Sequence, residues 1–164
     1  MTSLPHLGCY TIPSEVMKVT ERFLQERGRR GSEGLVLWAG REVSHRRLAI
    51  TRYLIPQQEA SALHFDVPEE EMKRILSELT KAGERLLVQI HSHPRDAFMS
   101  EADIRSPVVS HRGALSIVVP NYRSLQFRTL ADAKVFIYRA YGDWPELDST
   151  DLSTYFMIEE ARNV

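Results

Sequence analysis

Apolar residues recur at helical spacing in two segments of the chain. The first segment predicts a helix that Ser14 caps and Gly28 ends. The second predicts a helix with Asp66 as its cap, Pro68 just inside its start and Gly83 at its end. The two predicted apolar faces consist of Val16, Val19, Phe23 and Leu24 in the first helix and of Met72, Ile75, Leu76 and Leu79 in the second.

Apolar runs and alternating patterns predict strands between and after these helices. The predicted strands span residues 34–39, 48–55, 86–93, 113–119 and 134–141. In the third strand, alternation places Leu86, Val88 and Ile90 on one face and Leu87, Gln89, His91 and His93 on the other. A short helix is predicted from Ser100, with Pro107 limiting its length. Residues 142–154 predict a loop, and residues 155–160 an edge strand or a short helix.

The order of these elements indicates the fold class. Strands and helices mix without a regular strand–helix–strand alternation, which favours an α+β domain with a mixed or antiparallel sheet. A length of 164 residues is typical of one domain.

Composition and charge narrow the function classes. A net charge of -1 argues against a broad nucleic-acid or anionic-membrane surface. Cys9 is the only cysteine, which excludes an intramolecular disulfide and a zinc site built from cysteines. The first 13 residues contain no basic segment followed by an apolar run, and the longest uncharged apolar stretch, 34–40, is too short to span a membrane. We therefore expect no signal peptide and a cytoplasmic location.

The segment around His91 and His93 carries the candidate chemistry. Histidines two positions apart on a strand project from the same face, so both rings can reach one metal ion. Pro94 ends the strand, and the following short helix carries Asp103 in its first turn. Two histidines, one carboxylate and a water form an open zinc site. Glu33, at the start of a buried strand, is the candidate base.

Each of these features also has an ordinary structural explanation. Isolated histidines usually pack or face solvent, as we expect for His6, His45, His64 and His111. The Ser100-x-x-Asp103 spacing is typical of a capping box, and Glu33 alone would be a solvated carboxylate. Two histidines and a carboxylate also suit a non-haem iron oxygenase. The presence of Glu33 as a base favours hydrolysis over iron chemistry.

Taken together, the residues resemble the signature of the JAMM (MPN+, JAB) metalloproteases: a distant glutamate, then H-S/T-H-P, then S-x-x-D. Glu33 lies seven residues before Gly40 at the head of an apolar strand, as in that family. The resemblance continues through residues 115–120 and covers residues 14–141. The chain departs from the eukaryotic pattern in one respect, since six rather than seven residues separate His93 from Ser100.

The resemblance implies a fold and a set of roles. It implies a single MPN/JAMM domain (cytidine-deaminase-like) over residues 1–164, with a mixed, mostly antiparallel sheet flanked by helices. Its core would be residues 14–141, and residues 142–164 would pack on it or extend it. His91, His93 and Asp103 would bind one Zn²⁺ per chain. Glu33 would be the general acid/base, Ser100 would hold the oxyanion, and Ser92 and Pro94 would shape the ligand loop.

The short chain resembles the bacterial branch of the family, whose stand-alone members occur beside activating and conjugating enzymes for ubiquitin-like proteins, in some cases in antiphage defence. This implies a zinc isopeptidase or peptidase that cleaves after the C-terminus of a ubiquitin-like protein. That protein or its conjugates would be the partner, with the cognate activating and conjugating enzymes as further candidates and with no nucleic-acid or membrane partner. Two alternatives stay open: trimming of an amino acid or peptide from a sulfur-carrier protein, and a non-catalytic MPN scaffold. Scaffolds usually lack part of the motif, which is complete here.

Overall fold

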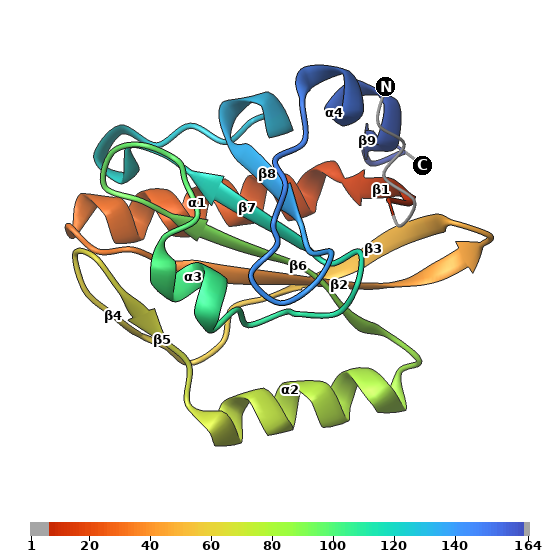
Figure 1. Ribbon diagram of the computed structural model, residues 1–164, viewed down its shortest axis with the longest axis horizontal. Coiled ribbons are helices and arrows are strands. Elements are labelled where there is room, and N and C mark those ends of the chain that lie inside the picture. Colours follow the sequence, from red (N-terminus) through yellow and green to blue (C-terminus); the bar gives the residue numbers. More distant parts are fainter. Residues whose placement is uncertain (1–6, 163–164) are drawn as a thin grey trace.

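A seven-stranded sheet forms the centre of the computed structural model, which describes residues 7–162 (Figure 1). Residues 1–6 lie outside the described residues. They include His6 and the beginning of the segment that was inspected for a signal peptide. The elements are β1 (Cys9–Pro13), α1 (Ser14–Arg29), β2 (Leu35–Ser44), β3 (Arg47–Leu54), β4 (Glu59–Ala60), β5 (Phe65–Asp66), α2 (Glu69–Lys81), β6 (Arg85–Ser92), α3 (Glu101–Arg105), β7 (Leu115–Val119), β8 (Lys134–Ile137), α4 (Ser149–Tyr155) and β9 (Phe156–Glu159). Short 3-10 helices lie at Tyr122–Ser124 and Leu130–Asp132.

The strand order is β8-β7-β6-β2-β3-β1-β9, with β4 and β5 forming a separate hairpin. Strand β2 is antiparallel to both β3 and β6, and the pairs β7–β8 and β4–β5 are antiparallel as well. The pairs β6–β7, β1–β3 and β1–β9 are parallel. Three pairs of the seven-stranded sheet are thus antiparallel and three are parallel, but the antiparallel pairs align more residues, so the sheet is mixed and mostly antiparallel by paired length. With its flanking helices it confirms the predicted fold class.

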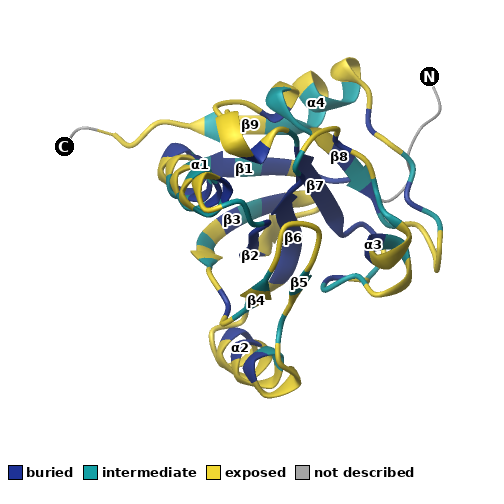
Figure 2. Ribbon diagram, turned by 90° about the vertical axis from the view of Figure 1, so that its left-hand side faces the viewer, coloured by how far each residue is buried: buried dark blue, intermediate teal, exposed yellow. Residues whose placement is uncertain are grey.

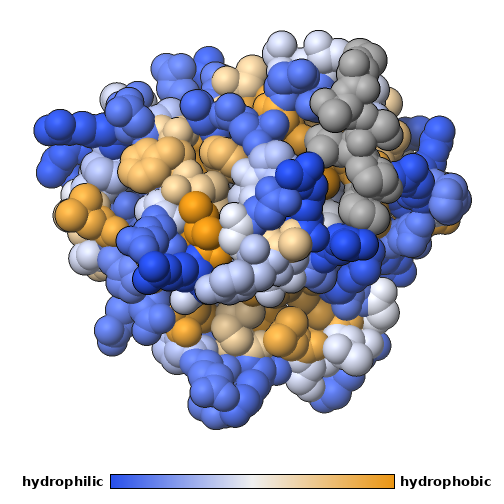
Figure 3. Space-filling model, in the orientation of Figure 1, coloured by the Kyte–Doolittle hydropathy of each residue, from blue (hydrophilic) through white to orange (hydrophobic). Residues whose placement is uncertain are grey.

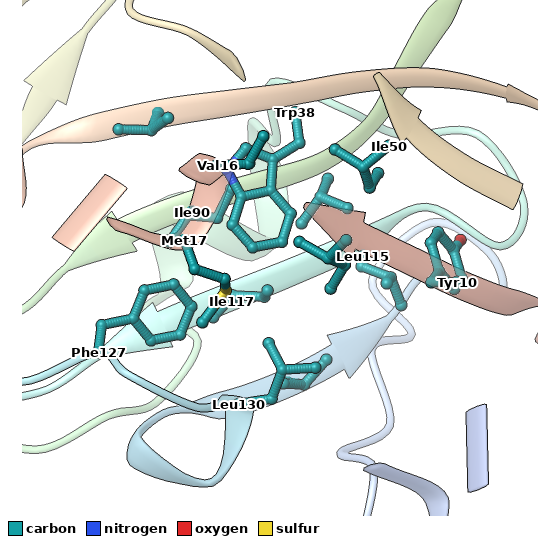
Figure 4. Packing of buried hydrophobic residues seen from close by; sticks show 14 of the residues in the cluster. Tyr10, Val16, Met17, Trp38, Ile50, Ile90, Leu115, Ile117, Phe127 and Leu130 are labelled. Carbon is teal, nitrogen blue, oxygen red and sulfur yellow. The ribbon is translucent and has the colours of Figure 1, made fainter. Parts of the chain in front are cut away.

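Helices cover the two faces of the sheet separately, and the core is divided accordingly (Figure 2). On one face, α1 packs Val16 and Met17 against strand residues that include Trp38 (Figure 4). The Trp38 indole N–H donates a hydrogen bond of 2.9 Å to the buried Thr20 hydroxyl, so this polar group does not interrupt the core. On the other face, Ile75 of α2 packs against a smaller cluster of strand residues. Among residues 7–162, no helix combines the length and the apolar character needed to cross a membrane.

The first helix differs from the prediction at both ends. Pro13 occupies the N-cap position, so Ser14 is the first residue of α1 and makes no capping bond. Gly28 does not end the helix but lies inside it and is buried. A Cβ at this position would come within 1.7 Å of the Tyr122 carbonyl oxygen, so glycine is required by the close approach of two backbones. The turn that follows has positive φ at Gly31 instead.

Four further predictions need correction. Pro68 is the N-cap of α2, while Asp66 belongs to β5. Leu86 joins the core cluster on the α2 side, whereas Val88 lies on the α1 side, because a β-bulge in β6 shifts its register against β2 between Leu86 and Val88. Residues 149–155 form α4 with Asp148 as the cap, although the prediction for 142–154 was a loop, and strand β8 ends at Ile137 rather than at 141. Residues 156–159 form the edge strand β9, which was one of the two predicted possibilities.

Candidate metal centre and cleft

Two histidines and one aspartate converge where β6 meets α3. The ring nitrogens His91 Nε2 and His93 Nε2 lie 3.2 Å apart. Asp103 Oδ2 lies 3.3 Å from His91 Nε2 and 3.5 Å from His93 Nε2. All three residues are shielded from solvent, none being more than 9% exposed. They form the group of side chains, among those described, whose spacing suits a shared metal ion.

Local backbone structure places His93 beside His91 even though β6 ends at Ser92. The His93 amide donates to the Val119 carbonyl at 2.9 Å, and the His93 carbonyl accepts from the Tyr122 amide at 3.0 Å. These bonds continue the alignment of β6 with the end of β7, so the alternation of side chains carries on by one residue. The two rings therefore stay on the same face of the sheet.

Asp103 is held by a capping box at the start of α3. Its Oδ2 accepts from the Ser100 amide at 2.8 Å, and the Ser100 hydroxyl accepts from the Asp103 amide at 3.2 Å. The same Oδ2 atom faces both histidine rings. The capping and the metal-binding interpretations of this sequence are thus compatible, because one carboxylate serves both purposes.

The electrostatics of this group favour a cation. The Asp96 carbonyl lies 3.2 Å from His93 Nδ1 and can only accept, so Nδ1 carries hydrogen and Nε2 of the neutral ring presents its lone pair to Asp103. Burial opposes ionisation of Asp103, but its contacts with His91 and His93 outweigh burial and hold its pKa well below the ordinary range. Burial lowers the pKa of His93, yet Asp103 and Glu33 raise it overall. Lone pairs and a carboxylate held this close need a proton or a metal ion between them, so the donor set fits a metal.

Glu33 lies just before β2 and lines the same cleft as His93 and Asp103. It is only 5% exposed. Burial raises the pKa of its carboxyl group from 4.5 to about 7, with His93 lowering it and Asp103 raising it. A carboxyl group with a pKa near neutrality can both take up and release a proton at physiological pH, which is the property a general acid/base requires.

The cleft has a volume of about 1150 Å³ and runs between the β4–β5 hairpin, α2 and α3. This is slightly above the usual range of small-molecule pockets, and the space is large enough for an extended peptide segment. Figure 3 shows apolar surface gathered between α3 and α2 on this side of the molecule. Apart from the polar site residues, much of the lining is apolar: Leu63, Phe65, Val67, Met72, Leu76, Phe98 and Val108.

The structure brings all five sequence-predicted site residues to one place. Glu33, His93, Ser100 and Asp103 line the cleft, and His91 lies behind them, fully buried. Their roles remain predictions, since the geometry alone does not test them.

The sequence analysis missed the hairpin that forms one wall of the cleft. Phe65 of β5 lies with its ring centroid 5.4 Å from that of His91, and His64, expected to be a packing or surface residue, is exposed and lines the cleft. The hairpin strands are two residues long, too short for any alternation to be recognised.

Comparisons with known proteins agree with this geometry. Residues 19–128, which include all five site residues, match the family described as prokaryotic homologs of the JAB domain. The chain is 31% identical over 162 residues to the probable metalloprotease y4jG of Sinorhizobium fredii (strain NBRC 101917 / NGR234), covering 96% of this chain and 99% of that protein. The fold is similar to the solution structure of protein DSY2949 from Desulfitobacterium hafniense, with a TM-score of 0.62 at 16% identity over 93% of this chain and 94% of that one.

Proposed function

The chain belongs to the prokaryotic JAB-domain family, and from this premise we propose that it is a zinc-dependent isopeptidase or peptidase that cleaves the amide bond after the C-terminus of a ubiquitin-like protein. The family, the metalloprotease relative and the His–His–Asp group support a metal-dependent peptidase. The observation that carries the proposal is the convergence of these three donors with a buried carboxyl group in a cleft large enough for a peptide.

The spacing of the donors supports zinc as the metal. Ligand atoms about 2.0–2.1 Å from a tetrahedral zinc ion lie roughly 3.3–3.4 Å from one another. The three separations among His91 Nε2, His93 Nε2 and Asp103 Oδ2 are 3.2, 3.3 and 3.5 Å. A zinc ion held by these atoms supplies Lewis acidity, which polarises a carbonyl group and eases deprotonation of a water molecule.

Glu33 and Ser100 would perform the remaining chemistry. Glu33 accepts the proton of the attacking water and then delivers it to the departing amine, and burial, which raises the pKa of its carboxyl group, favours the uptake of that proton. The Ser100 hydroxyl already accepts a hydrogen bond from the Asp103 amide, which leaves its own hydrogen free to donate. Directed into the cleft, that hydrogen would stabilise the negative charge developing on the carbonyl oxygen.

The shape of the cleft supports an extended protein tail as the substrate. Phe65 and Asp66 of β5 line it, and β5 pairs with β4 on one side only among the described strands, so its other edge can accept an additional strand. The apolar lining residues would then contact alternate side chains of the tail. A ubiquitin-like protein supplies such a tail at its C-terminus, and a conjugating system of the same cell would supply its targets.

The proposal is tested by metal analysis followed by cleavage assays. We expect one zinc per chain, and cleavage of fusions of a ubiquitin-like protein from the same genome at the end of its tail. Glu33→Ala should abolish cleavage and leave zinc bound. Cleavage by metal-loaded Glu33→Ala at the normal rate would refute the role of Glu33. Release of an amino acid from a sulfur-carrier fusion, with no cleavage of the other fusions, would identify a sulfur-carrier protein as the substrate instead.

A further inference from the structure

The side chain of Gln58 replaces a missing strand residue next to β2. On the edge of β2 that faces β3, strand pairing begins only at Leu37, because the chain turns away from β2 after Leu54. Leu35 is nevertheless paired: its amide donates to Gln58 Oε1 at 2.8 Å, and its carbonyl accepts from Gln58 Nε2 at 2.9 Å. A primary amide is planar and carries both a donor and an acceptor, so it can mimic a backbone peptide group.

We propose that Gln58 is a positioning residue for Glu33, and that it ties the carboxyl-bearing end of β2 to the hairpin that walls the cleft. The inference rests on the proposed role of Glu33 as the general acid/base. The side-chain hydrogen bonds of Gln58 go to Leu35 and Pro56 rather than to the donor atoms or to Glu33. It would act through the backbone of Leu35, two residues after Glu33.

The other hydrogen bonds at the start of β2 explain how the Gln58 side chain can affect the position of Glu33. The Glu33 amide donates to the Ser61 carbonyl at 2.8 Å, and the Gly34 amide donates to the Ser92 hydroxyl at 3.0 Å. Three consecutive amides at the start of β2 are therefore fixed by groups outside it. Two of their three acceptors, Gln58 and Ser61, belong to the segment that leads into and forms the hairpin.

Gln58 also forms a hydrogen bond within its own segment. Its Nε2 donates a second bond, of 3.0 Å, to the Pro56 carbonyl, so the side chain closes the turn between β3 and β4 as it holds Leu35. Across the sheet, Leu35 is the register partner of His91. The residue that Gln58 holds thus lies directly opposite a predicted zinc ligand, and movement of this edge changes the distance between Glu33 and the donor group.

Replacing Gln58 would leave the buried amide and carbonyl of Leu35 without partners. Leu35 has no exposed surface, so water cannot take over these bonds without a local opening of the strand end. The start of β2 and the hairpin would then move separately. Because proton transfer requires the base within hydrogen-bond reach of its water, we expect the loss to appear in kcat rather than in KM or zinc content.

The test compares Gln58→Ala with Gln57→Ala in the full-length, zinc-loaded protein. Gln57 is the exposed neighbour, and its backbone amide bond to Glu71 does not depend on its side chain. Amide hydrogen exchange is measured at Glu33, at Leu35 and, as an internal standard, at Trp38 in the middle of β2. Gln58→Glu keeps the acceptor for the Leu35 amide and loses both donors.

We expect Gln58→Ala to raise exchange at Glu33 and Leu35 at least tenfold with Trp38 unchanged, and to lower kcat about tenfold or more at constant zinc content. Gln57→Ala should match the wild type, and Gln58→Glu should fall between the wild type and Gln58→Ala. Unchanged exchange at Leu35, equal acceleration at Trp38, or faster exchange with an unaltered kcat would each overturn the inference. Exchange needs no substrate, so a protein that cleaves no fusion would refute the proposed function while exchange still decides whether Gln58 fixes this edge.

Discussion

Replacing Glu33 with glutamine should stabilise the metal-free protein while it abolishes turnover. Glu33 is 5% exposed, and burial raises the pKa of its carboxyl group from 4.5 to about 7. A pKa that is higher in the folded state than in the unfolded state means that folding favours the protonated form. The native state therefore loses stability as the pH rises from below 4.5 through 7, where the buried group must ionise.

The magnitude follows from the two pKa values. Each tenfold change in a proton-binding constant corresponds to about 1.4 kcal/mol. A rise of the Glu33 pKa from 4.5 to about 7 therefore means that ionisation of this buried group lowers the free energy of unfolding by at most ~3 kcal/mol above pH 8. Glutamine fills the same space but buries an amide, which costs ~1 kcal/mol if its hydrogen bonds are incomplete. A net gain of about 2 kcal/mol at pH 8 should raise Tm by ~4–8 °C in a domain of this size.

The assay measures Tm of the wild type and of Glu33→Gln in chelator at several pH values between 4 and 8.5. The difference between the two proteins should grow with pH, since at pH 4 the wild-type carboxyl group is largely protonated in both states. Adding zinc should reduce the difference, because a nearby dication favours the ionised form of Glu33. A difference that does not vary with pH would show that burial does not perturb Glu33 and would remove the electrostatic basis for its role.

Three further substitutions probe the ligand, the oxyanion group and the core. Asp103→Asn should weaken zinc binding about 100-fold or more, measured by competition with a chromophoric chelator, since it removes the anionic donor. Ser100→Ala should lower kcat about 100-fold with zinc retained, and Ser100→Thr, which keeps the hydroxyl group, should restore most of it; equal rates would contradict the role. Gly28→Ala should cost about 3 kcal/mol in urea unfolding, because its Cβ would overlap the Tyr122 carbonyl; unchanged stability would contradict that packing.

The parts of the fold that were predictable from sequence are those governed by strong periodicity. The apolar run that begins β2, the alternation in the second half of β6 and the amphipathic helices α1 and α2 each impose a pattern over several residues. Errors occurred where a tertiary contact overrode a local signal. Gly28 has the residue type of a helix end, yet its place inside α1 follows from contact with Tyr122, which is distant in sequence.

In the candidate site, too, the parts set by local sequence patterns were predictable and the parts set by tertiary contacts were not. His91, His93 and Asp103 were predictable because strand alternation and a capping box are local devices, and the structure shows both. The hairpin wall was not, because it depends on single bonds between distant groups, such as the Glu33 amide to the Ser61 carbonyl and the Tyr122 hydroxyl to the Ala62 carbonyl. The pattern of apolar and polar residues in 57–67 does not predict such hydrogen bonds.

The loop that connects the histidines to Asp103 can be short because other contacts set the position of α3. Only six residues separate His93 from Ser100. Before the helix, the Arg95 carbonyl accepts from the Asn121 amide at 2.8 Å. After it, the Val109 amide donates to Gln89 Oε1 at 2.9 Å.

Gln89 is buried in β6 two residues before His91, and its Nε2 donates to the Ser116 hydroxyl of β7 at 3.1 Å. The segment that carries Asp103 is thus fixed to the sheet on both sides, and the capping box orients the carboxylate itself. Removing one residue from the loop therefore changes the rim of the cleft more than the donor geometry. Since Phe98 of this loop lines the cleft, the shortened loop would affect which substrate the proposed peptidase accepts, while the donor distances remain within the range that a single metal ion such as zinc requires.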